Sequence, residues 1–266
     1  MGISIIGLSV GFVCLALSLL WIRYEMSYDS FHEGANRIYL AGNSIRINSI
    51  GFDYWSQKEL RPYLIKNYPE VEAACCVCPK NPQYYGVRHE EGFEFPLAEI
   101  EVDSNFISMF HITVLEGNTP LRLDTRQIAI TDKAARRIFG KESPLGKELT
   151  FTKYNNSKKT IVAVIKSFEG PSLFSFDILH PYFNERSSVP VYTLFRVYPD
   201  IDIEKLEKKL EHAVLPVNGY DWPSPTPIVP LTKLRTLHPQ EEMNVKMGHI
   251  RMFAYIGFLV FFLRVV

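Results

Sequence analysis

The chain has 266 residues, enough for one large domain or two small ones. Lys plus Arg and Asp plus Glu number 29 each, so the formal net charge is zero, which argues against a broad nucleic-acid-binding surface because that surface needs a basic excess. Hydrophobic residues make up 47% and aromatic residues 13%, so the chain outside any membrane segment can form a substantial core.

The first predicted element is a transmembrane helix over residues 3–22, a stretch without a charged side chain. At about 1.5 Å per residue it spans roughly 30 Å, the thickness of a bilayer's hydrocarbon core. Trp21 and Tyr24 lie at its far end, where aromatic rings favour the headgroup layer. Gly7 and Gly11 form a G-x-x-x-G step, so they are the candidate residues for transmembrane helix packing.

Three alternatives to a retained membrane anchor are weaker. A buried core helix is usually shorter and interrupted by polar residues. A cleaved signal peptide needs a basic region before the apolar run and small residues at the cleavage site. No basic residue precedes this run, and Trp21-Ile22-Arg23 offers no small residue. A lipoprotein signal needs a small residue before Cys14, where Val13 stands.

The four cysteines do not form a spread-out disulfide pattern, because Cys14 lies in the apolar run and Cys75, Cys76 and Cys78 lie together. Cys75 and Cys78 form one C-x-x-C, which is weak evidence for zinc without a second pair. A redox motif would need a strand-to-helix turn, whereas prolines follow here. We therefore expect small core residues in a buried strand over 71–77.

The rest of the chain alternates helical and strand patterns, which predicts an α+β fold. Helices are expected over 53–68 with Asp53 as N-cap, over 106–110 after a cap at 103–105, over 133–139 after a cap at Thr131 or Asp132, and over 202–213. Strands are expected over 84–87, 93–95, 100–102, 128–130, 148–152, 160–166 and 192–197, and a proline-rich loop over 216–230.

Charged residues return directly after the apolar run, in RYEMSYDSFHEGANRIYLAG. Asp29 and His32 in this segment are expected to lie in a solvated turn next to the membrane rather than in a catalytic site. The Tyr-Glu-x-Ser-Tyr-Asp-x-Phe-His run and the Asn-Arg-Ile-Tyr that follows it resemble the segment after the first transmembrane helix in FtsX-like ABC transporter permeases with a MacB-like periplasmic core domain. Further stretches are similar to this family in the same order: 6–11, 103–117, 128–147, 160–179 and 230–239.

The resemblance implies three segments: a transmembrane helix over 3–22, a mixed α/β MacB-like periplasmic core domain over 24–250, and a second transmembrane helix over 252–266. Twelve uncharged residues, 252–263, reach only about 18 Å as a helix, so we interpret this second span as partial and the chain as truncated relative to the family.

The function implied is that of a non-catalytic permease subunit in the bacterial inner membrane, with its main domain in the periplasm. Its partners would be a separate cytoplasmic ABC ATPase, the lipid bilayer and a second permease copy in a dimer. It would couple the ATPase to the extracytoplasmic domain in efflux or mechanotransmission. The alternative is a membrane-tethered extracytoplasmic binding or sensor domain that works without an ATPase.

Motifs for enzymatic chemistry are incomplete in this sequence. Gly140 and Gly146-Lys147 resemble a P-loop, but the glycines are one residue too far apart and Glu148 follows the lysine. His89-Glu90-Glu91 lacks the second histidine of H-E-x-x-H, and G-x-S-x-G does not occur. The protein is therefore predicted not to be an enzyme. We assign no catalytic, cofactor-binding or metal-binding residue, expect no cofactor and no nucleic-acid partner, and rank a membrane-bound hydrolase a distant third.

Overall fold

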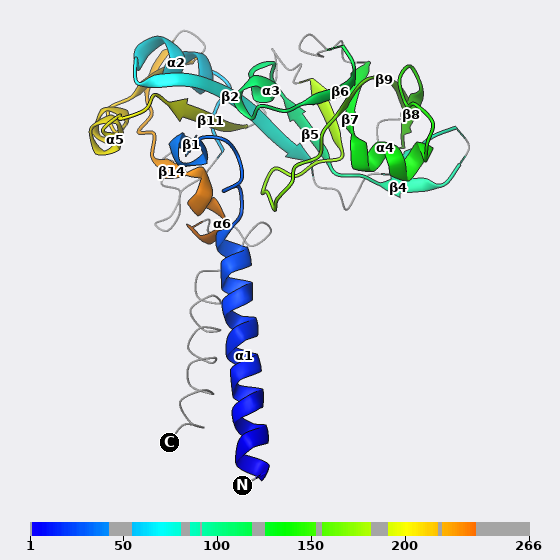
Figure 1. Ribbon diagram of the computed structural model, residues 1–266. Coiled ribbons are helices and arrows are strands. Elements are labelled where there is room, and N and C mark those ends of the chain that lie inside the picture. The colour runs from blue at the N-terminus through cyan, green and yellow to red at the C-terminus, as the bar shows by residue number, and fades with distance from the viewer. Residues whose placement is uncertain are drawn as a thin grey trace.

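The computed structural model describes residues 2–42, 55–80, 86–90, 92–118, 126–152, 156–181, 191–217 and 220–237. Among the described elements one long helix, α1 (Gly2–Met26), projects from a mixed α/β body that contains the others (Figure 1). The mixed α/β domain expected from the sequence is therefore confirmed. Within these ranges no helix is both long and apolar enough to qualify as a membrane span.

The elements after α1 follow in chain order: η1 (Ala35–Arg37), β1 (Ile38–Ala41), α2 (Leu60–Asn67), β2 (Val71–Lys80), β3 (Gly86–Arg88), β4 (Glu94–Pro96), β5 (Glu99–Val102), α3 (Asn105–Met109), β6 (Val114–Gly117), β7 (Gln127–Thr131), α4 (Asp132–Phe139), β8 (Glu148–Phe151), β9 (Ser157–Ile165), β10 (Ile178–Pro181), β11 (Tyr192–Val197), α5 (Ile203–Leu210), β12 (Val214–Val217), β13 (Tyr220–Pro223), β14 (Ile228–Pro230), η3 (Leu231–Lys233) and α6 (Leu234–Leu237).

One large sheet organises the described part of the body. Its strand order is β14-β1-β11-β2-β5-β10-β7-β9-β8-β3-β4, with β6 paired to β9, while β12 and β13 form a separate hairpin. The pairs β5–β10 and β7–β9 are parallel, and the other pairs are antiparallel. β10 lies between β5 and β7, so it joins the half of the sheet that carries α2 and α5 to the half that carries α4 (Figure 1).

Alternation of side chains along the strands separates the two faces of this sheet. One face forms a central core that includes Leu194, Ile100 and Leu179, together with Phe106 of α3 and Phe110, which follows it. The opposite face has two clusters. One lies under α2 and α5, and the other lies under α4. The body therefore has two lobes that share a continuous sheet.

Side-chain caps explain where two helices begin, and the cap at Thr131 agrees with the prediction. Thr131 Oγ1 accepts a hydrogen bond from Ala134 N at the start of α4, and Asp202 Oδ1 accepts one from Lys205 N at the start of α5. Both N-cap residues have extended backbone angles, which let the side chain reach back over the first turn.

The strands predicted over 71–77, 128–130, 148–152, 160–166 and 192–197 are also confirmed, with bounds that differ by a few residues.

Two predictions are wrong in part. The helix expected over 53–68 begins only at Leu60, because Ser56 pairs in extended form with Val191; Asp53 lies outside the described residues. The segment 216–230 is not one loop, because it holds the end of β12 and all of β13 and β14. Its prolines are tolerated because β12 and β13 form a two-stranded hairpin and β14 is an edge strand, where a missing N–H need not break a ladder. Residues 252–266 lie outside the described residues.

Candidate functional site

An ion pair joins the end of α1 to the last described helix. Arg235 Nε, on α6, donates to Glu25 Oε2, on α1, at 2.7 Å. Glu25 is only 4% exposed, so its charge is largely removed from water. The Arg235 guanidinium also lies 4.4 Å from the centre of the Tyr28 ring, where a cation is attracted to the ring face. The ion pair and the contact between the guanidinium and the ring therefore join α1 to α6 at the base of the body (Figure 1).

Tyr28 reinforces this point. Its ring meets the Tyr24 ring edge to face, with centroids 5.6 Å apart. Burial and a hydrogen bond with Tyr24 raise the pKa of Tyr28 to about 12, so its phenol stays neutral across the physiological range. A neutral phenol does not compete with Glu25 for the charge of Arg235.

Asp29 anchors the turn after α1 to the connector between β9 and β10. Its Oδ1 accepts a hydrogen bond from Ser172 Oγ, and its Oδ2 accepts one from Leu173 N at 3.1 Å. Its backbone N donates to Pro171 O at 2.9 Å. Asp29 is fully buried and has φ of +57°, a left-handed conformation that aspartate and asparagine adopt more readily than most residues.

His32 extends the same contact. Its ring centroid lies 4.0 Å from that of Phe31, 4.8 Å from that of Phe110 and 4.7 Å from that of Phe168. Its Nε2 lies 3.5 Å from Asp29 Oδ1. The expectation of a solvated turn is therefore wrong, because both side chains are buried against the connector 166–176. Two of the rings that cover His32, those of Phe110 and Phe168, lie far away in the sequence.

We call the set Glu25, Tyr28, Asp29, His32 and Arg235 the root of α1. Its contacts reach β10 through the connector and β14 through η3 and α6. Sequence reasoning singled out Asp29 and His32 but missed Arg235 and Ser172. The alternation of acidic and aromatic residues in YEMSYD was the available signal for Glu25 and Tyr28, while nothing local marked their partners.

Gly7 and Gly11 lie one turn apart on α1, as the sequence predicted, so they share one side of the helix. Their proposed role in packing against another helix stays a prediction.

Cys75 and Cys76 lie buried on β2, in agreement with small core residues, and Cys78 is half-buried on the same strand. Burial raises the pKa of Cys76 to about 12 and that of Cys75 well above its usual value, which keeps both as unreactive thiols.

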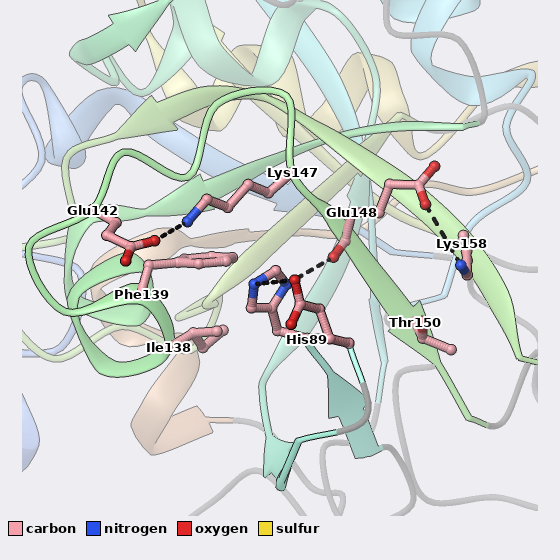
Figure 2. Close-up of a pocket in the computed structure, with 9 residues that line it drawn as sticks. His89, Ile138, Phe139, Glu142, Lys147, Glu148, Thr150 and Lys158 are labelled. Atoms are coloured by element: carbon pink, nitrogen blue, oxygen red, sulfur yellow. Dashed lines mark hydrogen bonds and ion pairs between the residues drawn. The ribbon is translucent and has the colours of Figure 1, made fainter.

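A second feature is an open pocket of about 980 Å³ in the α4 lobe, between α4, β8, β9 and the end of β3. In Figure 2 the His89 ring lies beside Phe139, with the Glu142–Lys147 pair on one side and the Glu148–Lys158 pair on the other. The described residues bring together no group of three or more His, Cys, Asp or Glu side chains that could hold a metal ion.

Comparison with known proteins identifies the family. The model of the MacB-like periplasmic core domain matches residues 1–213, so the chain belongs to that family, a domain of transporter permeases. The matched residues include both α1 and most of the α/β body, and these two parts of the chain contact each other at the root of α1. No curated protein sequence matches the chain.

Three solved structures align with parts of the chain, and the first of them supports the same fold. A domain described as part of a permease protein from Porphyromonas gingivalis aligns with a TM-score of 0.56 and 19% identity, over 67% of this chain and 80% of that one. The periplasmic region of MacB from Actinobacillus actinomycetemcomitans gives 0.47 and 16%, over 67% and 82%. The extracellular domain of the noncanonic ABC-type transporter YknZ from Gram-positive bacteria gives 0.44 and 18%, over 57% and 78%.

Proposed function

We propose that this protein is a non-catalytic permease subunit that couples a separate cytoplasmic ABC ATPase to an extracytoplasmic domain, in efflux or mechanotransmission. In this proposal residues 3–22 cross the bacterial inner membrane, residues 24–250 lie in the periplasm, and residues 252–266 form part of a second span. A second copy of the permease completes a dimer, with Gly7 and Gly11 on the packing side of the first span.

The observation that carries the proposal is the root of α1. A helix that relays movement needs a fixed attachment at its end, because otherwise it would tilt without displacing the domain. The Glu25–Arg235 pair and the two hydrogen bonds accepted by Asp29 provide that attachment. Leu173 lies only a few residues before β10, the strand that joins the two lobes. A displacement of α1 is thereby directed at the middle of the sheet.

The surface of α1 supports the membrane location. Its large apolar side chains between residues 12 and 20 are mostly more than half exposed: Phe12, Val13, Leu17, Leu19 and Leu20. In water a patch of this kind would favour association, whereas hydrocarbon tails would cover it without cost. The sequence from residue 3 to residue 11 likewise has no charged side chain.

Trypsin treatment of intact spheroplasts tests the topology, with a C-terminal tag for blotting and a cytoplasmic protein as the integrity control. We expect cleavage within residues 24–250 while the control stays intact. Protection that ends only on lysis would place the domain in the cytoplasm and reject the proposal.

Co-purification tests the ATPase partner. A tagged chain, solubilised in mild detergent, is expected to retain a cytoplasmic ABC ATPase.

The second candidate function is a tethered binding or sensor domain. It is favoured by the open pocket near His89, and it requires no ATPase partner. Isolation of the chain without an ATPase, under conditions that keep a known permease–ATPase complex intact, would favour this second function.

A further inference from the structure

We infer that a chain of hydrogen bonds through Lys159, His180 and Glu99 is a latch that fixes the angle between the two lobes of the body. The three residues come from β9, β10 and β5, so the bonds pass from the α4 lobe to the lobe that carries α2 and α5. The latch belongs to the α/β body, and its action does not depend on the proposed permease function.

The backbone pairing that joins the two halves of the sheet is short at one place. β10 pairs with β5 along its whole length, from Ile178 to Pro181. On its other side, within the described residues, β10 pairs with β7 only at Ile178 and Leu179, which lie opposite Ile130 and Ala129. Few backbone hydrogen bonds hold these two strands at one twist, so the pairing resists rotation weakly. Side-chain contacts across β7 can therefore decide the angle between the lobes.

Apolar packing is also interrupted at this place, on one face of the sheet. On one face the central core continues from β11 to β9, but on the opposite face the cluster under α2 and α5 is separate from the cluster under α4. Glu99 and His180 are next in sequence to Ile100 and Leu179, which belong to the central core. Because side chains alternate along a strand, Glu99 and His180 lie on the opposite face, where the two apolar clusters do not meet.

The geometry of the three side chains defines one arrangement. Lys159 Nζ lies 3.0 Å from His180 Nδ1, and His180 Nε2 lies 2.9 Å from Glu99 Oε2. An ammonium group only donates, so Nδ1 accepts, and Nε2 carries the proton that it donates to Glu99. The side chains of His180 and Glu99 are 1% and 0% exposed. The Phe151 ring packs against both the His180 ring, with centroids 5.2 Å apart, and the Lys159 ammonium, 5.7 Å from its centre.

The bond between Lys159 and His180 is the one that crosses the short pairing, because β9 and β10 lie on opposite sides of β7. Glu99 positions the His180 ring so that Nδ1 faces Lys159. Rotation of the lobes about the β7–β10 pairing would separate Lys159 from His180 and leave the buried carboxylate without the nearby ammonium, which is costly. Apolar side chains would permit the same rotation with less loss, because their contacts are not directional.

Double electron–electron resonance tests the latch through the distribution of distances between spin labels on the two lobes. The labels are attached to unnatural amino acids at the exposed positions Lys141, next to α4, and Lys208, on α5, in the full chain in nanodiscs. A control pair at Lys66 and Lys208 lies within one lobe. We expect Lys159→Met to broaden the distribution between the lobes at least about twofold and to leave the control pair unchanged.

Two further variants separate a latch from a general contribution to stability. Glu99→Leu combined with His180→Phe replaces the buried polar pair with apolar side chains, so the thermal midpoint should not fall. The distribution between the lobes should still broaden, because Lys159 loses its acceptor on β10. Lys158→Met makes the same chemical change at the exposed neighbouring residue, and it should leave the distribution unchanged.

A distribution as narrow in Lys159→Met as in the unchanged chain would overturn the inference. Equal broadening in Lys158→Met would also overturn it, as would equal broadening of the control pair, which would indicate a general loosening of the fold. Lys159 is only half-buried, so its variant gives this answer even where the double variant does not fold.

Discussion

Arg235 Nε and Glu25 Oε2 lie 2.7 Å apart, although 210 positions separate the two residues in the sequence. The pair joins the first helix of the chain to α6 and is shielded by Tyr28. A buried ion pair of this kind contributes little net stability compared with an apolar replacement, but removal of one partner strands the other charge. Its value lies in fixing where α1 attaches.

The first prediction concerns this pair. Glu25→Gln and Arg235→Gln should each lower the free energy of unfolding by about 2–3 kcal/mol, since each leaves a partly buried charge without its partner. The double variant should be no less stable than the worse single variant, because neither charge remains. Thermal unfolding of the full chain in detergent measures all three. Strictly additive losses would show that the two side chains do not interact.

The second prediction separates the charge of Asp29 from its geometry. Asparagine adopts the left-handed conformation and can keep a hydrogen bond with both Ser172 and Leu173, so Asp29→Asn should cost about 1 kcal/mol. Asp29→Ala loses both bonds and strains the backbone, so we expect a loss of about 3 kcal/mol. The thermal midpoints of the two variants give the order. A cost for asparagine equal to that for alanine would mean that the charge itself stabilises the root.

The third prediction is a loss of stability at alkaline pH that depends on two buried thiols. Burial raises the pKa of Cys76 to about 12, and that of Cys75 well above its usual value. Below pH of about 8.5 both thiols are protonated in the folded and unfolded states, so they contribute no pH dependence. Above it the unfolded chain loses protons that the folded chain keeps. Each thiol therefore lowers the free energy of unfolding by about 1.4 kcal/mol per pH unit.

Urea unfolding at pH 7.5 and pH 9.5 measures this effect. The comparison is with a variant carrying Cys75→Ala and Cys76→Ala, whose stability should fall less over the same interval. The interval ends below the usual pKa of tyrosine, about 10, so that phenols add little. An identical fall in both proteins would assign the alkaline loss to other groups.

The fourth prediction compares two glycines with positive φ. A Cβ at Gly117 would lie 2.2 Å from the backbone oxygen of Val162, so Gly117→Ala should cost more than about 3 kcal/mol because the strand β9 would have to move. Gly146 has φ of +76° and open space around it, so Gly146→Ala should cost only about 1 kcal/mol of backbone strain. The urea midpoints of the two variants test this. Equal costs would indicate that conformation, rather than close approach, decides at Gly117.

Helices and strands with strong local signals were predictable. The Thr131 cap and Gly140 delimit α4, and short runs of β-branched, aromatic and other apolar residues indicate β9 and β11. The strands over 214–230 were not, because the signal for a loop came from prolines that the sheet accommodates at an edge and in a hairpin. Local propensity says nothing about whether a strand lies at an edge, and that position decides if a missing N–H matters.

The sequence by itself determined the class of the chain: an uncharged run followed by an acidic, aromatic segment and an α/β pattern that together indicate a MacB-like permease domain. It also marked Asp29 and His32, but assigned them to solvent. Only the tertiary structure decided their burial, because Phe110, Phe168 and Ser172 reach them from segments more than seventy positions away. The partner of Glu25 was likewise decided by folding, since the charge balance at a site depends on which side chains meet in space.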